Sequence, residues 1–280
     1  MIIDAHTHVF PPQMIAQRDE LLTTEPAFRE VYSDPRAALA TADDVLQMIE
    51  RSEVDAAVIC NFAWSDAERV RDTNDYVLDA ATASGGRLIP FCMLQPAAGD
   101  AAVRAELERM TRAGAGGIGE LRPEQQGYSL GDETTATLLA EASSAYGLPL
   151  LFHVSEPVGH CYPGKSGLAL ADFARFLREH PEATVIGAHW GGGLPLYATM
   201  PEVRADLQGV YVDTAASRLL YSDAIYRTVA ALVGAETILF GSDFPLRDPA
   251  AEIAHIRSLG LGPGEESAIL GGNAARLLGR

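Results

Sequence analysis

The sequence of 280 residues is poor in cysteine, in basic side chains and in long apolar runs. Its three cysteines, Cys60, Cys92 and Cys161, are odd in number, and no two have the CxxC spacing. A disulfide framework needs paired cysteines, so free thiols in a reducing compartment are expected. Two of the three lie in apolar, strand-like runs, where cysteine is usually an inert small hydrophobe. We therefore expect a cytoplasmic protein.

Basic residues are outnumbered by acidic ones. The 21 Lys and Arg residues stand against 38 Asp and Glu, which gives a net charge of -17. This charge repels a phosphate backbone, and the basic residues are dispersed rather than clustered. The composition therefore argues against nucleic acid as a partner.

No apolar run approaches the roughly 20 residues of a membrane helix. Asp4 and His6 interrupt the N-terminal apolar run at once, where a secretory signal peptide would continue. With 48% hydrophobic and 21% charged residues, the composition is that of a globular protein. We expect no membrane partner and a small-molecule substrate.

Short runs rich in β-branched residues recur along the chain, and each is followed by a helical pattern. The eight predicted strands are 2–6, 55–60, 87–94, 116–121, 148–154, 184–189, 209–215 and 237–243. Most are almost entirely apolar, as expected of strands covered on both faces. The predicted helices are one capped by Asp43 and Asp44, then 66–83, 101–113, 133–146, 169–179, 222–233, 249–259 and 265–278.

Strands that alternate with helices predict an α/β fold, and eight of them favour a (β/α)8 TIM barrel formed by residues 1–280 as a single domain. A doubly wound open sheet is the alternative, since alternation does not decide whether the sheet closes. Three long connections, 9–42, 154–168 and 190–208, follow the carboxyl ends of predicted strands. Barrel active sites are built on that face.

Histidines gather at the carboxyl ends of the predicted strands. Of the seven histidines, His6, His8, His153 and His189 lie there. Random placement would scatter histidines over helices and loops. Their common position on one rim favours a shared role over four separate structural ones.

Carboxylates join these histidines on the same rim. Asp243 ends the eighth predicted strand, and Glu120 and Asp213 lie near the ends of the fourth and seventh. Because side chains at i and i+2 share one face of a strand, Asp4 should point the same way as the two HxH histidines and support them. Imidazole and carboxylate donors together suit Zn²⁺, Mn²⁺ or Fe²⁺. The pattern predicts a metal site with an open position for water or substrate.

The motifs DAHTH, LFHV, AHWGG and FGSDFP, in this order and spacing, resemble the amidohydrolase superfamily. More narrowly they are similar to its amidohydrolase-2 branch, which also contains the aminocarboxymuconate-semialdehyde decarboxylase type. The closing GGNAARLLG is similar to that branch's C-terminal helix, so the resemblance covers essentially the whole chain. It implies that His6, His8, His153 and Asp243 bind the metal. It also implies that His189 stands beside the reacting water or substrate as an electrostatic or acid/base group.

Residue chemistry agrees with these catalytic roles for Asp243 and His189. A carboxylate held beside a cation stays ionised, so Asp243 could both bind the metal and accept a proton. His189 could stabilise a developing oxyanion. The expected cofactor is a divalent ion, zinc first, with manganese, iron or magnesium as alternatives.

Glu120 has two interpretations. In the first it bridges two ions, the second held also by His189, as in the ligand set of the TatD-like deoxyribonucleases that this pattern also resembles. In the second it partners Arg122 or orients a ligand. The number of ions, one or two per chain, depends on which holds.

Other polar and aromatic residues are candidates for substrate binding or for structure alone. The substrate-binding candidates are Trp190, Arg218, Arg122, His160, Tyr162 and Lys165. The 9–42 segment carries Phe10, Phe28 and Tyr32 and could form a lid. His180 and His255 lie in helical patterns, and no functional role is expected for them.

The favoured function is a metal-dependent hydrolase of an amide, lactone or ester in a small, carboxylated molecule. The alternative is a non-oxidative decarboxylase of an aromatic or unsaturated acid, since the same ligands serve both reactions. A TatD-like nuclease is opposed by the net charge of -17. A non-enzymatic barrel is opposed by the presence of ligands at every expected strand end. The resemblance also implies a homodimer.

Overall fold

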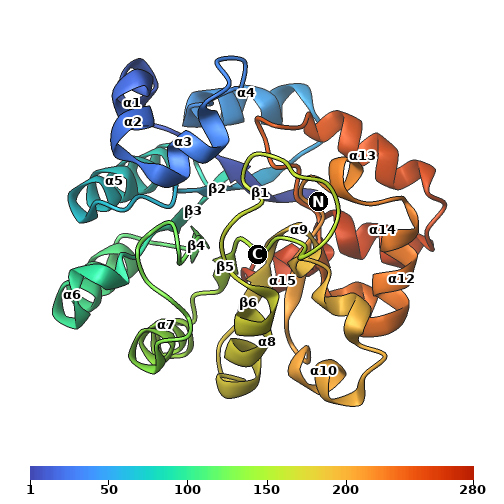
Figure 1. Cartoon of the computed structure of the whole chain (residues 1–280). Helices are drawn as coiled ribbons and strands as arrows, with labels where there is room; N and C mark the ends of the chain where they lie inside the picture. The colour runs from blue at the N-terminus through green and yellow to red at the C-terminus, as the bar shows by residue number, and fades with distance from the viewer.

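A computed structural model describes all residues 1–280. Eight parallel strands pair in sequence order, and the helices surround them as an outer ring (Figure 1). The strands are β1 Ile3–His8, β2 Ala56–Cys60, β3 Leu88–Cys92, β4 Gly117–Leu121, β5 Leu150–Phe152, β6 Val185–Gly187, β7 Tyr211–Asp213 and β8 Ile238–Leu239. The predicted (β/α)8 barrel is confirmed.

Backbone hydrogen bonds from β1 to the chain that follows β8 close the barrel. The Asp243 N–H donates to the His6 carbonyl at 2.9 Å, and the His8 N–H donates to the Phe244 carbonyl at 2.7 Å. An open sheet would leave both edges unpaired. The alternative of a doubly wound open sheet is therefore wrong.

Seven longer helices cover the strands. They are α4 Ala42–Arg51, α5 Ala67–Ala83, α6 Asp100–Arg112, α7 Glu133–Tyr146, α8 Leu170–Glu179, α12 Ala224–Val233 and α13 Pro249–Ser258. The cap of α4 differs from the prediction. Thr41 is its N-cap, and Asp44 is the third helical residue, whose carboxylate accepts the Thr41 N–H at 2.8 Å. This reciprocal capping box outcompetes a cap by Asp43 or Asp44.

The shorter helices lie in the connections and at the C-terminus. They are α1 Pro12–Ala16, α2 Arg18–Thr24, α3 Pro26–Tyr32, α9 Ala188–Gly191, α10 Pro201–Asp206, α11 Ser217–Leu220, α14 Pro263–Ser267 and α15 Asn273–Leu277. A π-helical turn over Ala268–Gly272 divides the single helix predicted for 265–278. None of the helices has the length and apolarity needed to cross a membrane.

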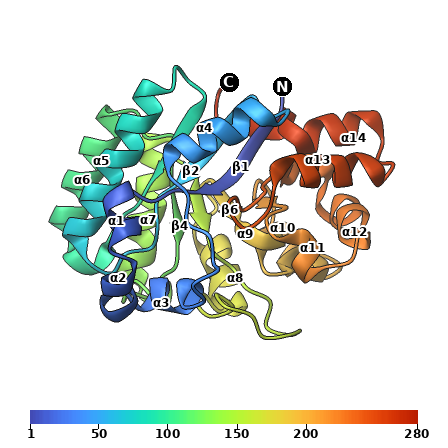
Figure 2. The ribbon, with the colours of Figure 1, turned by 90° about the horizontal axis from the view of Figure 1, so that it is seen from above.

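Alternate side chains of each strand enter two different cores. On β2, Ala57 and Ile59 pack in the large cluster shared with the helices. Ala56, Val58 and Cys60 pack in a cluster of 12 residues inside the barrel. Both termini lie at one end of the barrel, and α2 and α3 lie at the other (Figure 2). The carboxyl ends of the strands open toward α3.

A β-bulge in β1 separates Asp4 from the histidines. Asp4 pairs with Ala57, whereas His8 pairs with Cys60, so the register shifts by one residue between Asp4 and Thr7. Ala57 faces the helices and Cys60 faces the barrel interior. The prediction that Asp4, His6 and His8 point the same way is therefore wrong for Asp4, because the extra residue inverts the alternation.

A second bulge lies in β4. Ile118 pairs with Leu150, and Leu121 pairs with Phe152. An advance of three residues along β4 therefore matches an advance of two along β5. The extra residue falls beside Gly119, which has a φ of 142°. This bulge directs the Glu120 side chain into the mouth of the barrel and not away from it.

Replacing Gly119 with alanine tests this geometry. An added Cβ atom would lie 2.4 Å from the Leu151 carbonyl oxygen, whereas at Gly127, also with positive φ, it would meet nothing within 4 Å. Both substitutions place alanine in an unfavourable conformation, at about 1–2 kcal/mol. Only Gly119→Ala adds a backbone clash. We expect it to lower the free energy of urea unfolding by about 2 kcal/mol more than Gly127→Ala does. Equal losses would contradict the bulge.

Candidate active site

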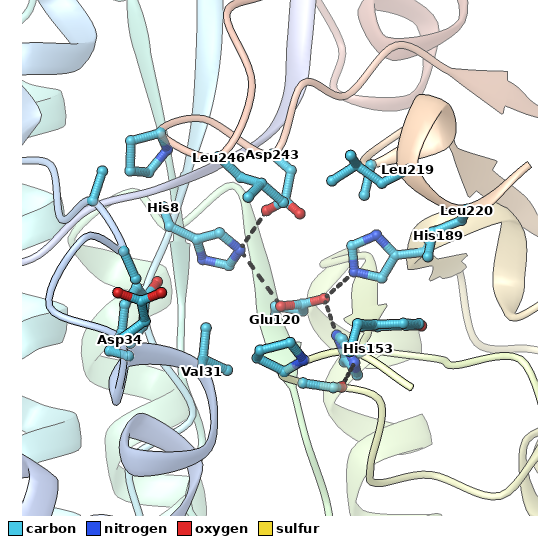
Figure 3. A pocket seen from close by; sticks show the side chains of 18 of the residues that line it. His8, Val31, Asp34, Glu120, His153, His189, Leu219, Leu220, Asp243 and Leu246 are labelled. Atoms are coloured by element: carbon cyan, nitrogen blue, oxygen red, sulfur yellow. Dashed lines mark hydrogen bonds and ion pairs between the residues drawn. The ribbon is translucent and has the colours of Figure 1, made fainter. Parts of the chain in front are cut away.

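A cavity of about 650 Å³ opens at the carboxyl ends of the strands. One side of it is polar and comprises His8, Glu120, Arg122, His153, His189 and Asp243. Apolar and aromatic side chains, which we call the apolar wall, also line the cavity: Val31, Tyr32, Phe62, Leu219, Leu220, Pro245 and Leu246. Figure 3 shows the Glu120 carboxylate between His8 on one side and His153 and His189 on the other. Of the residues of the apolar wall, Val31 and Tyr32 come from the predicted long connection 9–42.

His6 and His8 present nitrogens to the same point. Their Nε2 atoms lie 3.1 Å apart, and Asp243 Oδ1 lies 3.3 Å from that of His8 and 3.9 Å from that of His6. Two nitrogens that bind one zinc ion tetrahedrally at about 2.0–2.1 Å lie about 3.3 Å apart. The spacing of these three donors therefore fits a divalent cation.

Asp213 fixes the orientation of His6. Its Oδ2 lies 2.8 Å from His6 Nδ1, and its Oδ1 accepts the backbone N–H groups of His189 at 2.9 Å and Ala215 at 3.0 Å. With Nδ1 occupied, only Nε2 of His6 is free to join the donors of His8 and Asp243. A carboxylate behind a histidine is the usual support of a metal ligand. The sequence placed Asp213 near the end of a strand but gave it no role; its position on the rim was the available signal.

Glu120 lies at the centre of the polar side. Its Oε1 is 2.9 Å from His153 Nδ1 and 3.4 Å from His189 Nε2, and its Oε2 is 3.6 Å from His8 Nε2. With His6 and His189 it forms a second group of donors close enough to hold an ion. The alternative role of Glu120 as the partner of Arg122 has no contact to support it, because the guanidinium contacts Glu30.

His153 is placed differently from the other predicted ligands. Its Nδ1 faces Glu120, and its Nε2 lies 2.8 Å from the Gly164 carbonyl and 3.1 Å from Ser155 Oγ. It belongs to neither of the two groups of converging donors. Metal ligation by His153 stays a prediction, and it would require the Gly164 carbonyl to leave Nε2.

The pKa values of two buried histidines, His6 and His189, are raised. Burial disfavours a charged His6 ring, but nearby carboxylates outweigh burial and raise the pKa of His6 to about 10. Those carboxylates are on Asp213, Glu120 and Asp243. Burial likewise disfavours a charged His189 ring, but the hydrogen bond to Glu120 and the charge of Asp243 outweigh burial and raise the pKa of His189 to about 9. Both rings are therefore protonated near neutral pH when no cation is bound.

The carboxylates of the site remain ionised. Burial opposes their charge, but the histidines hold the pKa of Glu120 and the pKa of Asp243 below their usual ranges. Burial and the charge of Arg122 lower the pKa of His153. Ionised oxygens are the form in which these carboxylates bind a cation.

Strained backbone positions aim two of the side chains. His189 and Asp243 have φ values of 54° and 62°, in the left-handed region that non-glycine residues rarely adopt. Such conformations cost about 1–3 kcal/mol each and persist where the surroundings hold them. Here the His189 N–H is held by Asp213, its Nδ1 lies 3.2 Å from the Ala215 carbonyl, and the Asp243 N–H is held by His6.

Three of the six substrate-binding candidates line the cavity: Arg122, His160 and Tyr162. The other three do not. Lys165 instead donates from Nζ to the Val158 and His160 carbonyls. Its prediction as a pocket residue is wrong, because the turn of its own loop satisfies the ammonium group.

Trp190 and Arg218 also lie away from the cavity. The Trp190 indole is fully buried, donates to Ser217 Oγ at 2.6 Å and packs against Tyr226. The Arg218 guanidinium lies 3.6 Å from Glu252. Both predictions as pocket residues are wrong, because the turns after β6 and β7 direct these side chains outward.

Residues 155–168, which we call the strap, lie over the polar side between β5 and α8. Arg122 Nη2 donates to the carbonyls of Gly164 at 3.0 Å and Ser166 at 3.4 Å. Glu30 of α3 accepts the Ser166 N–H at 3.2 Å. The strap is thereby joined to β4 and to the 9–42 segment.

The 9–42 segment forms one wall of the cavity. Phe10, Phe28 and Tyr32 pack with Phe62 and Trp64 in a cluster of rings with neighbouring centroids 4.8–6.0 Å apart. Tyr32 also lines the cavity. The predicted aromatic residues therefore anchor the segment, and a lid motion stays a prediction.

Asp4, His180 and His255 contribute nothing to the cavity. Asp4 Oδ1 accepts the N–H groups of His6 and Ser242 at 3.2 and 2.9 Å, and burial raises the pKa of Asp4 to about 7. His180 lies 3.4 Å from Glu182 and His255 lies 3.0 Å from Asp223. Asp4 supports His6 through its backbone and not through its ring.

A family model described as Amidohydrolase matches residues 3–280. The chain belongs to the amidohydrolase family. No curated protein sequence matches it significantly.

Several solved structures are similar to this amidohydrolase chain, all at low identity. The 5-carboxyvanillate decarboxylase of Sphingomonas paucimobilis has a TM-score of 0.80 at 18% identity, covering 99% of this chain and 98% of its own. A dihydroxybenzoic acid decarboxylase of Polaromonas sp. JS666, with bound manganese and 2-nitroresorcinol, has 0.76 at 15%, covering 99% and 96%. The 2,6-dihydroxybenzoate decarboxylase of Rhizobium has 0.73 at 17%, covering 99% and 98%.

The hold of Arg122 on the strap can be tested through Lys165, the only lysine in the sequence. Arg122→Met removes the hydrogen bonds to the Gly164 and Ser166 carbonyls. We expect a lysine-specific protease to cut after Lys165 at least about tenfold faster, since a hydrogen bond from a charged group contributes about 1.5–3 kcal/mol. Arg218→Met is the control, since Arg218 pairs with Glu252 and makes no bond to the strap. Equal cutting of both variants and wild type would contradict the contact.

Proposed function

We propose that this amidohydrolase-family chain is a metal-dependent, non-oxidative decarboxylase of a small aromatic carboxylic acid. One observation carries the proposal: the donors of His6, His8 and Asp243 converge, and His8 and Asp243 line a cavity together with the apolar and aromatic side chains of the apolar wall. A flat ring fits against such a wall while its carboxylate reaches the donors. Three similar structures are described as decarboxylases of hydroxybenzoates or of carboxyvanillate.

The hydrolase favoured from sequence is less well supported than this alternative. The same donors serve hydrolysis, but the similar structures named by activity are decarboxylases. A TatD-like nuclease finds no support, because a phosphate backbone would meet ionised Glu120 and Asp243 and a net charge of -17.

The proposed cofactor is one divalent cation per chain, held by His6, His8 and Asp243. Both groups of converging donors include His6, which has a single free nitrogen because Nδ1 faces Asp213. One lone pair binds one ion, so the two groups describe neighbouring positions and not two sites. When bound, the cation polarises substrate oxygens and offsets the negative charge of the site. Nitrogen and oxygen donors suit manganese as well as zinc, and a similar structure contains manganese.

His189 is the proposed proton donor. Decarboxylation breaks the bond between the ring and the carboxyl carbon, leaves the electron pair on the ring carbon and requires a proton there. His189 lines the cavity, and its Nε2 lies 3.4 Å from Glu120 Oε1, a carboxylate that favours the protonated ring. Asp243, whose pKa is held low, stays ionised and is therefore able to hold the proposed cation. The apolar wall excludes water that would otherwise compete for the proton.

The single-domain organisation, the cytoplasmic location and the homodimer stay predictions. They follow from the strand count, the free cysteines and the resemblance, and the proposed reaction depends on none of them.

The experiment is a carbon dioxide assay on manganese-loaded protein. 2,6-Dihydroxybenzoate and 5-carboxyvanillate, named for the similar structures, are tested beside a panel of lactones, esters and amides. We expect release of CO₂ from an aromatic acid and none of the hydrolysis products. His189→Gln should lower kcat by about 10²–10⁴-fold, the usual contribution of a proton donor, while leaving manganese affinity within about threefold. Hydrolysis of a panel member without CO₂ release from any aromatic acid would refute the proposal.

Asp213 supplies a second test, independent of activity. Asp213→Asn keeps the shape but removes the charge that fixes the His6 ring. We expect manganese affinity, measured by isothermal titration, to fall about 10–100-fold, as when other supporting carboxylates are removed. Asp223→Asn is the control, since that carboxylate is exposed and contacts His255. Unchanged affinity in Asp213→Asn would show that His6 is not a ligand.

A further inference from the structure

Arg122 is a buried cation with unused hydrogen-bond donors. It follows β4, is only 3% exposed and lines the cavity. Its Nη2 donates to two strap carbonyls and lies 3.5 Å from Glu30 Oε2. Its Nε is buried without any acceptor, and no hydrogen bond from its Nη1 is present. A guanidinium normally satisfies its donors, most strongly with a carboxylate.

No other arginine or lysine of the cavity is buried. The remaining arginine that lines it, Arg36, has an 89% exposed side chain and is paired with Asp34. Glu30, the only charged partner of Arg122, is itself partly exposed and also accepts the Ser166 N–H. Unpaired donors on a buried guanidinium are costly. Nη1, which makes no hydrogen bond and is not among the fully buried atoms, is the donor that a ligand anion could reach.

Arg122 lies about one ring's length from His153, which contacts Glu120 at the centre of the polar side. The Gly164 carbonyl oxygen is 2.8 Å from His153 Nε2 and 3.0 Å from Arg122 Nη2, so these two nitrogens are at most about 6 Å apart. Glu120, two residues before Arg122, contacts His153 at 2.9 Å. An aromatic ring with two acidic substituents spans such a distance.

We propose that Arg122 determines substrate specificity by binding a second anionic oxygen group, a carboxylate or phenolate, on the ring of the aromatic acid. This rests on the proposed function. The reacting carboxylate loses its negative charge as CO₂ leaves, so an arginine on that group would stabilise the substrate more than the transition state. A group that stays anionic throughout is the better partner. The preferred substrates are therefore ring acids with two acidic oxygen groups.

The test compares two probes by isothermal titration of manganese-loaded protein: benzoate, with one carboxylate, and benzene-1,3-dicarboxylate, with two. We expect wild type to bind the dicarboxylate about ten- to hundredfold more tightly than benzoate, the usual effect of a hydrogen-bonded charge pair. Arg122→Met should remove that preference and leave benzoate affinity within about threefold. Arg122→Lys, which keeps the charge without the planar fork, should retain part of it.

Gln125→Ala is the matched control for loosening of the strap. Gln125 Nε2 bonds to Ser166 Oγ and lies 3.4 Å from Glu30 Oε2, so this variant disturbs the same contacts but keeps the cation. We expect it to retain the dicarboxylate preference. Thermal unfolding and manganese affinity check that each variant is folded, and Arg122→Gln replaces Arg122→Met if the latter is not.

An unchanged preference in Arg122→Met, or an equal loss of affinity for both probes, would overturn the assignment. Loss of the preference in Gln125→Ala to the same extent would overturn it too, because the strap and not the cation would then be responsible. Failure of the proposed function is recognised separately. If no aromatic acid releases CO₂ but the preference depends on Arg122, the anion site stands without the decarboxylase.

Discussion

The hydrogen bonds of the Asp213 carboxylate are the constraint on which the candidate site depends. One oxygen fixes the ring of His6 on β1, and the other holds the backbone of His189 after β6 and of Ala215 after β7. A single buried group thus sets which His6 nitrogen faces the cavity and keeps His189 in its left-handed conformation. Neither side chain could be aimed by its strand alone, because strand geometry fixes only the face on which a residue lies.

Besides the hydrogen bonds of Asp213, two β-bulges determine the directions of side chains in and around the site. In β1 the extra residue turns Asp4 outward, where it braces the backbone of β1 and of the chain after β8. In β4 the extra residue turns Glu120 inward, to the centre of the histidines. The histidines and carboxylates thus form a compact cluster in which opposite charges pair with one another when no cation is bound. The cavity combines this cluster with an apolar wall and one buried guanidinium, and this combination supports recognition of an anionic ring.

Much of the fold and the centre of the site could be predicted from sequence. Apolar runs and helical periods gave all eight strands, and the rim positions of His6, His8 and Asp243 followed from where those runs end. The rest depends on tertiary geometry. A bulge leaves no sign in the alternation of polar and apolar residues along a strand. The predicted direction of Asp4 is therefore wrong, and the direction of Glu120 could not be predicted. Trp190 and Arg218 lie at the right strand ends, but the turns that follow direct them away from the cavity. The hydrogen bond between His153 and Gly164 joins residues on one loop and has no sequence signature.

The most direct test of the central claim is a crystal structure of manganese-loaded protein with anomalous scattering measured for the metal. The account predicts one anomalous peak per chain, within about 2.0–2.4 Å of the Nε2 atoms of His6 and His8 and of an Asp243 oxygen. Two peaks bridged by Glu120 would contradict the single ion. A peak that lies away from His6 and His8, or no peak in manganese-saturated crystals, would contradict the metal site itself.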